Sequence, residues 1–247
     1  MTTIAFCNHK GGVGKTTSTA SVGVAMARLG MRVLLVDLDG QANLTGIFLQ
    51  DDVEVSIYDS LVEKSPLPLV RIEDNLDLVP SNLNMSAAEA KMTQLIQREM
   101  RLANLLAKQK ANYDYILIDC PPSLGIVTIN AFFAADEIYV PVAAEILPLK
   151  GMMMIENVLE DLREAKPEIK ISGVFVTRFD SRKNINKSVE EAVRAQYENV
   201  VFNTHIRDHV SLSEVPGSGG SIFDYDGKGK GAQDYLALTR EILERTN

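Results

Sequence analysis

Short apolar runs alternate along the chain with longer segments in which apolar residues recur every three or four positions. The apolar runs have the length and composition of buried strands, and they occupy residues 4–7, 32–36, 75–80, 115–119, 137–141 and 171–177. The periodic segments predict helices at residues 17–29, 86–110, 126–134, 150–165 and 186–197. Strands that alternate with helices form a parallel sheet covered on both faces, with ligands at the carboxyl ends of the strands. The pattern therefore predicts a three-layer α/β/α fold around a mostly parallel twisted sheet.

A glycine-rich turn lies between the first predicted strand and the first predicted helix. Residues 10–17 read KGGVGKTT, a loose form of the phosphate-binding loop G-x-x-x-x-G-K-[ST]. In such a loop the backbone N–H groups surround the phosphates, Lys15 reaches the terminal phosphates, and the Thr16 hydroxyl binds Mg²⁺. The motif predicts a P-loop NTPase fold that binds ATP and Mg²⁺ through the following loop residues: Gly11, Gly12, Val13, Gly14, Lys15, Thr16 and Thr17.

Lys10, at the front edge of this loop, has no role in an ordinary P-loop. It precedes Lys15 by five positions and starts on the far side of the loop. From there it is poorly placed for the nucleotide of its own chain and well placed for that of a neighbouring chain. We therefore count Lys10 with Lys15 as a candidate catalytic residue, in a protein that works as a dimer.

Carboxylates close two of the predicted strands. Asp119 follows the apolar run at residues 116–118, which is typical of an aspartate that holds Mg²⁺ through its water shell. Asp39 is the candidate that orients the attacking water or accepts its proton, because phosphoryl transfer depends mainly on positioning and charge stabilisation. Asp37 either supports one of these tasks or only caps its strand. The predicted Mg²⁺ residues are Thr16, Asp39 and Asp119.

Composition sets further limits on the class of protein. The 247 residues contain no Pro/Ser-rich linker, so residues 1–247 are expected to form a single domain. The two cysteines, Cys7 and Cys120, lie in or beside apolar strands with no signal-peptide pattern before them, which favours a reducing cytoplasm. No apolar stretch approaches the roughly 18 residues needed to cross a bilayer, so we expect no membrane-spanning segment.

Several segments together resemble the deviant Walker motifs of the ParA/Soj ATPases, which are relatives of MinD. They are KGGVGKTT at residues 10–17, VDLDGQAN at 36–43, IDCPPS at 118–123, VPVAAE at 140–145 and LSEVPG at 212–217. The resemblance implies a cytoplasmic ATPase with weak intrinsic activity that forms an ATP-sandwich homodimer. It further implies that the dimer binds DNA without sequence preference, associates with the nucleoid, and partitions plasmids or chromosomes with a ParB-like partner. Lys10 would then cross the dimer interface to the partner's phosphates.

The resemblance also assigns adenine contacts and exposes one departure from the family pattern. The family's adenine contacts map onto Thr177, Arg178 and Pro216. Gly40 stands where the family usually has proline, and this change is expected to loosen the turn behind Asp39.

The net charge of −8 argues against DNA binding, but local clusters of Lys and Arg decide contacts to a phosphate backbone. The candidates for DNA contact fall into two clusters and one isolated arginine: Arg182, Lys183 and Lys187, then Lys228 and Lys230, and finally Arg207. For each cluster the alternative is a solvated face without a ligand. A dimer would double any such patch, which makes DNA binding depend on ATP.

Other P-loop proteins remain as alternatives. A MinD-like ATPase that cycles on a membrane or positions proteins would need a basic amphipathic helix at the C-terminus. Residues 236–247 instead have mixed charge and contain neither lysine nor an aromatic residue. A reductase of the nitrogenase type would need cysteines at a cluster between subunits, and neither cysteine fits that place. A metabolic kinase or ligase is also possible, although no additional substrate motif is visible.

Overall fold

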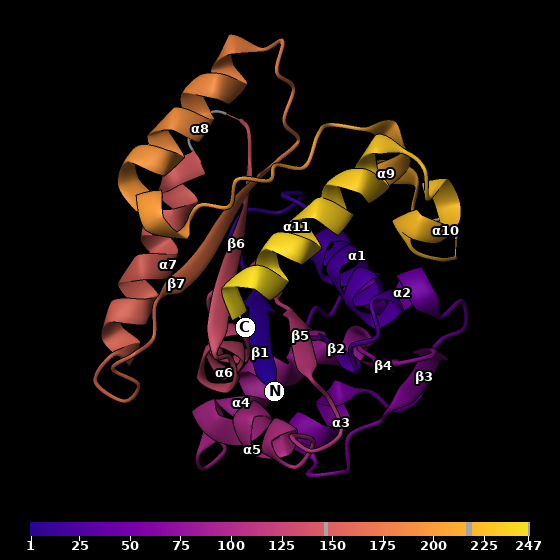
Figure 1. Ribbon diagram of the computed structural model, residues 1–247. Helices are drawn as coiled ribbons and strands as arrows, with labels where there is room; N and C mark the ends of the chain where they lie inside the picture. Colours follow the sequence, from indigo (N-terminus) through magenta and orange to yellow (C-terminus); the bar gives the residue numbers. More distant parts are fainter. Residues whose placement is uncertain (146–147, 216–218, 247) are drawn as a thin grey trace.

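The computed structural model describes residues 1–145, 148–215 and 219–246, and these form one seven-stranded sheet with helices on both faces (Figure 1). The strand order is β3-β4-β2-β5-β1-β6-β7, and all neighbouring strands are parallel except β3 and β4. The strands are β1 (Thr2–Phe6), β2 (Val33–Asp37), β3 (Val70–Glu73), β4 (Leu76–Val79), β5 (Tyr115–Asp119), β6 (Glu137–Ala143) and β7 (Ile171–Thr177). The predicted three-layer α/β/α architecture is confirmed.

An apolar core lies between the sheet and the helices on each of its two faces. One core packs the sheet against α1 (Lys15–Arg28), α2 (Asn43–Phe48), α10 (Ile222–Asp226) and α11 (Lys230–Thr246), with α9 (Val210–Glu214) beside the start of α11. The other core packs it against α3 (Ile57–Val62), α4 (Ala88–Met92), α5 (Arg101–Ala107), α6 (Ile126–Ala134), α7 (Pro148–Leu162) and α8 (Asn184–Tyr197). Short 3-10 helices within the described residues include η1 (Leu83–Ala87), η2 (Arg98–Met100) and η3 (Glu198–Val200).

The centre of the sheet brings the motif segments together. β5 pairs with β1 on one side and with β2 on the other, and in these registers Asp119 lies opposite both Phe6 and Asp37. The phosphate-binding loop, residues 10–17, begins shortly after Phe6, so the loop and the carboxylates of two strands meet at one edge. Parallel pairing of the buried runs is therefore what forms the site.

The predicted helix at residues 86–110 is wrong, because the chain breaks there into η1, α4, η2 and α5. The break lies at Gln97, which has a left-handed backbone with φ of 53°. The side chain of Asn130, on α6, stabilises the backbone that follows this break. Its Oδ1 accepts the backbone N–H of Leu102 at 3.1 Å, and its Nδ2 donates to the carbonyl of Arg98 at 2.7 Å and to that of Ile126 at 2.9 Å. Asn130 is fully buried, so this tertiary contact overrides the local helical period.

The strand predicted at residues 75–80 is β4, and the sequence pattern missed its antiparallel neighbour β3. The two strands are joined at Asp74 and Asn75, and Asn75 has a positive φ of 63°. Asn tolerates this conformation in tight hairpin turns. β3 lies at the edge of the sheet and is only partly buried, which explains why it lacks a continuous apolar run.

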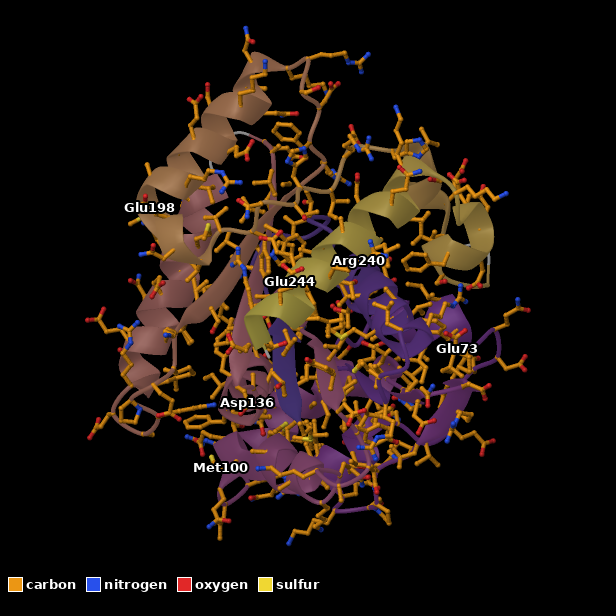
Figure 2. All side chains as sticks on the ribbon, viewed as in Figure 1. Glu73, Met100, Asp136, Glu198, Arg240 and Glu244 are labelled. Atoms are coloured by element: carbon orange, nitrogen blue, oxygen red, sulfur yellow. The ribbon has the colours of Figure 1, made fainter. Side chains whose placement is uncertain are left out.

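Helix α11 packs its apolar side onto the protein and presents charges outward. Tyr235, Leu238 and Ile242 are buried in the core on the α1 side. Figure 2 shows Arg240 and Glu244 on the outward side of the helix, where both are exposed. Among the residues that the structure describes, no helix is both long and apolar enough to cross a membrane.

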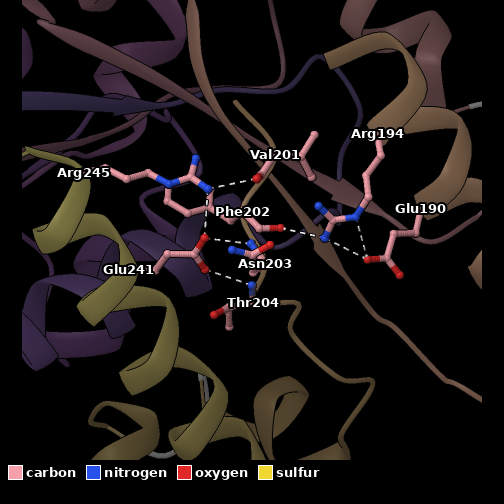
Figure 3. A network of polar contacts seen from close by, with 8 residues as sticks. All are labelled: Glu190, Arg194, Val201, Phe202, Asn203, Thr204, Glu241 and Arg245. Atoms are coloured by element: carbon pink, nitrogen blue, oxygen red, sulfur yellow. Dashed lines mark hydrogen bonds and ion pairs between the residues drawn. The ribbon is translucent and has the colours of Figure 1, made fainter. Parts of the chain in front are cut away.

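A polar network near the end of α11 joins it to α8 and to the segment that follows η3 (Figure 3). Glu241 accepts the backbone N–H groups of Asn203 at 2.7 Å and Thr204 at 2.9 Å, and it pairs with Arg245 at 2.8 Å. Burial alone would raise the pKa of Glu241, but these hydrogen bonds and the Arg245 charge lower it below its ordinary value. The network fixes the last helix through an ionised carboxylate.

Candidate nucleotide-binding site

The loop between β1 and α1 has the backbone of a phosphate cradle. Gly12 and Gly14 have positive φ values of 71° and 90°, which side chains other than glycine rarely allow. Helix α1 begins at Lys15, so its unpaired N–H groups point into the loop. Lys15 is 7% exposed, and its ammonium donates to the carbonyl of Lys10 at 3.3 Å. The cradle therefore holds its lysine close to where terminal phosphates would lie.

Thr16 and the buried Asp119 form a hydrogen-bonded pair beside this cradle. The Thr16 hydroxyl donates to Oδ2 of Asp119 at 2.7 Å. The other oxygen, Oδ1, is buried and has no hydrogen-bond partner among the described residues. Burial raises the pKa of Asp119 well above its ordinary value, and the nearby charge of Asp37 raises it further. A carboxylate whose charge is this costly, with one oxygen unpaired next to a threonine hydroxyl, fits a divalent cation.

The described residues contain no cluster of three His, Cys, Asp or Glu side chains that could hold a metal by themselves. Mg²⁺ commonly takes one or two protein oxygens and completes its shell with phosphate oxygens and water. The donor set Thr16 and Asp119 matches that habit. The prediction that Asp39 also belongs to the Mg²⁺ set stays a prediction.

Asp37 holds the turn that carries Asp39. Its carboxylate is fully buried and accepts the backbone N–H and hydroxyl of Thr45, both at 2.8 Å, and the backbone N–H of Asp39 at 3.0 Å. Burial raises the pKa of Asp37 to about 6, although these hydrogen bonds oppose the rise. The side chain of Asp39 is half-buried at the cavity wall, and its Oδ1 accepts the N–H of Gln41 at 2.9 Å. Asp37 therefore positions the turn, and Asp39 faces the open site.

The turn at Gly40 is closely packed, which differs from the loose turn that we expected. The carbonyl of Asp39 accepts the Ser81 hydroxyl at 2.7 Å. A Cβ added at Gly40 would lie 2.6 Å from Ser86 Oγ and 2.9 Å from the Ser86 backbone nitrogen. Glycine lets η1 approach the turn at a distance that no side chain would allow.

The loop opens into a cavity of about 460 Å³ that could hold a nucleotide. Thr177, at the end of β7, lines it and donates its hydroxyl to the carbonyl of Val13 at 2.8 Å. Arg178 lines it as well, with a left-handed backbone at φ of 52°. The third predicted adenine contact, Pro216, lies outside the described residues.

Lys10 lies at the mouth of the loop and contacts a carboxylate of its own chain. Its ammonium is 2.6 Å from Oε2 of Glu145, and the guanidinium of Arg178 is 3.2 Å from Oε1 of the same carboxylate. The three side chains are about half exposed. Whether Lys10 crosses to a second copy stays a prediction, and in the isolated chain its charge is already paired.

The structure separates the predicted DNA contacts into different environments. Arg207 lines the nucleotide cavity, and both its Nε and Nη2 bind the carboxylate of Asp234. It is therefore less available to DNA than the sequence indicated. The other candidates are exposed, with three around the start of α8, one between α10 and α11, and one at the first residue of α11: Arg182, Lys183, Lys187, Lys228 and Lys230. Of these, Arg182 pairs with Asp180 at 2.9 Å.

Sequence reasoning missed Glu145 and Asp234 as partners of basic residues at the site. Glu145 is the last residue of the VPVAAE motif at residues 140–145, but nothing in that motif indicates which cation it pairs with. Asp234 lies 27 positions after Arg207, on helix α11, whereas Arg207 lies in the segment before α9, so no local pattern could join them.

Comparisons with known proteins agree with this geometry. Residues 1–171 match the family model described as an AAA domain. The chain is 40% identical over 245 residues to the sporulation initiation inhibitor protein Soj of Bacillus subtilis, covering 97% of each chain. It is 38% identical to the chromosome partitioning protein ParA of Myxococcus xanthus, covering 98% of this chain and 88% of that one. Among solved structures, cobyrinic acid a,c-diamide synthase from Mycobacterium smegmatis, with bound ATP analogue and magnesium, superposes with a TM-score of 0.86. Its identity is 33%, with coverage of 98% of this chain and 94% of that chain.

Proposed function

The chain belongs to the ParA/Soj family of P-loop ATPases, and we propose on that premise that it hydrolyses ATP to ADP and phosphate in order to partition DNA. The observation that carries the proposal is the hydrogen bond from Thr16, which lines the cavity beside Lys15, to the buried Asp119. It supports a cation site next to the phosphate cradle, and hydrolysis of a nucleoside triphosphate uses both.

The residues at the cavity divide the chemistry among them. Backbone N–H groups of the loop and the Lys15 ammonium bind the terminal phosphates, where they offset negative charge. Thr16 and Asp119 would hold Mg²⁺, which supplies further charge neutralisation there. Asp39 orients the attacking water or accepts its proton. Hydrogen bonds with Asp37 and Ser81 hold the turn that carries Asp39.

The finer steps of the proposal follow the family pattern. The intrinsic hydrolysis is weak, and ATP brings two copies into a sandwich in which Lys10 of each reaches the phosphates of the other. The dimer then binds DNA without sequence preference, and a ParB-like partner stimulates hydrolysis. Residues 1–247 act as one domain in the cytoplasm, on the nucleoid while ATP is bound.

Sizing by light scattering in ATP, ADP or no nucleotide tests the central step. We expect wild type to dimerise only with ATP, Asp39→Ala to stay dimeric because it cannot hydrolyse ATP, and Lys10→Ala to lose the dimer or its hydrolysis. A monomer under every condition would overturn the mechanism.

DNA binding is tested with a random-sequence duplex at several salt concentrations. Replacing Lys183 and Lys187 with Ala should weaken ATP-dependent binding and reduce the slope of log affinity against log salt by about one per lost phosphate contact. The matched control replaces two exposed lysines near the end of α5, Lys108 and Lys110. Equal binding by Lys15→Ala and wild type would contradict the requirement for ATP.

The two remaining alternative functions predict that different molecules stimulate ATP hydrolysis. A membrane-cycling ATPase is disfavoured because α11 packs its apolar side onto the core. Cosedimentation with anionic vesicles would revive it. The similarity to a cobyrinic acid a,c-diamide synthase is the observation that supports a metabolic reaction, so turnover should be compared with duplex DNA and with cobyrinic acid. Stimulation by cobyrinic acid alone would support the metabolic function.

A further inference from the structure

Glu145 forms ion pairs with two cations from different segments of the chain at the nucleotide site. Lys10 comes from the phosphate-binding loop, and its Nζ lies 2.6 Å from Oε2 of Glu145. Arg178 comes from the end of β7, and its Nη1 lies 3.2 Å from Oε1. One carboxylate therefore links the front edge of the loop to the end of β7.

The backbone next to Glu145 is anchored, so the carboxylate does not simply follow Lys10. The N–H of Ala144 donates to the carbonyl of Thr177 at 2.9 Å, which continues the pairing of β6 with β7. The carbonyl of Ala144 accepts the side-chain amide of Asn186, near the start of α8. Asn186 is 3% exposed, and its Oδ1 also accepts the N–H of Asp180 at 2.7 Å.

The Lys10 ammonium has to leave Glu145 before it can bind a phosphate of another chain. The hydrogen bond from Lys10 lowers the pKa of Glu145 more than partial burial raises it, and Arg178 lowers it further, so the carboxylate is ionised near neutral pH. A competing anion must offer Lys10 more charge than one carboxylate does. A terminal phosphate of a triphosphate meets that condition, because it carries several anionic oxygens.

We propose that Glu145 is a positioning residue that holds Lys10 within its own chain until the ATP of a second copy displaces it. This inference rests on the proposed function, because it presumes that Lys10 acts across a dimer. Glu145 then sets the ATP concentration at which the dimer forms, and it keeps the isolated chain from pairing at low ATP.

The test measures the ATP concentration for half-maximal dimerisation by light scattering, in an Asp39→Ala parent so that ATP is not consumed. Losing an exposed ion pair changes an equilibrium by up to about fivefold, so with two copies the dimerisation constant of Glu145→Gln should rise by up to about 25-fold. The half-maximal ATP concentration should fall accordingly. Glu164→Gln, an exposed carboxamide substitution just past the end of α7, serves as the matched control and should not shift it.

A second arm separates a positioning role from a merely structural one. With Lys10→Ala added, Glu145→Gln should have no effect on dimerisation and should not restore a dimer that Lys10→Ala has lost. Thermal unfolding without nucleotide should be close for Glu145→Gln and its parent, because both partners of the pair are half exposed.

The possible failures are distinguishable. If the Asp39→Ala parent does not dimerise with ATP, the proposed function fails. If the parent dimerises but Glu145→Gln leaves the half-maximal ATP concentration unchanged or raises it, only the role of Glu145 fails. A shift that persists equally without Lys10 would also overturn it, since the effect would then act through another group.

Discussion

Gly40→Ala tests how closely the turn behind Asp39 packs against η1. The added Cβ would lie 2.6 Å from Ser86 Oγ, which can rotate away, and 2.9 Å from the Ser86 backbone nitrogen, which cannot. Either the turn or η1 must therefore move. Overpacking of this kind costs about 1–3 kcal/mol of unfolding free energy.

The same substitution at Gly46 is the internal control. Gly46 lies within α2, and a Cβ there would meet nothing within 4 Å. Alanine is favoured over glycine inside a helix by about 0.8–1 kcal/mol, so Gly46→Ala should stabilise the protein. One chemical change at two nearby positions is thus expected to have opposite signs.

Urea unfolding and ATP hydrolysis are the two assays. For a chain of this size each kcal/mol corresponds to about 2–4 °C in Tm, so a parallel thermal scan should place Gly40→Ala about 2–12 °C below wild type. Hydrolysis should fall in Gly40→Ala, because Asp39 moves with the turn, and should be unchanged in Gly46→Ala. Adding Ser86→Gly to Gly40→Ala should recover part of the loss, because it removes Oγ and leaves the backbone contact.

The reasoning about the turn would be refuted by equal unfolding free energies for Gly40→Ala and wild type. A full recovery with Ser86→Gly would also contradict it in part, because the contact with the Ser86 backbone nitrogen would then carry no cost.

Three further substitutions probe other contacts. Thr16→Ala should lower ATP hydrolysis and raise the Mg²⁺ concentration that it requires, because Asp119 loses its hydroxyl partner. Thr16→Ser should keep both properties near wild type. Equal activity of the two variants in a Mg²⁺ titration would count against the cation site. Asn130→Ala should lower the free energy of unfolding in urea by about 2–4 kcal/mol, because the Asn130 side chain makes three hydrogen bonds to backbone groups in a buried site. A loss below about 1 kcal/mol would show that the break in residues 86–110 does not depend on Asn130. Glu241→Gln should lower the free energy of unfolding at pH 7. The difference from wild type should shrink as the pH falls below about 4.5, because the pKa of Glu241 is lower in the folded state and its stabilisation is lost on protonation. A difference in unfolding free energy that stays constant between pH 7 and pH 3 would contradict this assignment.

The sequence predicts those parts of the fold that depend on local periodicity. Helix α6 was expected at residues 126–134 and has those bounds, because its pattern is not interrupted by distant contacts. The segment 86–110 has an equally helical period, but the deciding hydrogen bonds come from Asn130, which lies after it in the chain. The edge strand β3 is too polar for a rule based on buried runs.

The candidate site divides in the same way. Lys15, Thr16 and Asp119 could be named from the sequence because each has a fixed place relative to a strand end, and the structure brings them together. The pairing of Lys10 with Glu145 could not be named, because it depends on how β6 lies beside β1. The same holds for Asp37, whose three hydrogen bonds hold the Asp39 turn in a way that no spacing encodes.

The central place of β1 and β5 in the sheet has a consequence for folding. Phe6 and Asp119 are opposite each other in the middle of the sheet, although more than a hundred positions separate them in the chain. A nucleotide can therefore bind only after this long-range pairing has formed, and it stabilises that state by about 2.7 kcal/mol at a concentration one hundred times its Kd. Strand β3 lies at the edge of the sheet and is separated from β1 by β4, β2 and β5. Hydrogen exchange should accordingly slow at the centre of the sheet when nucleotide is added, and change least at β3.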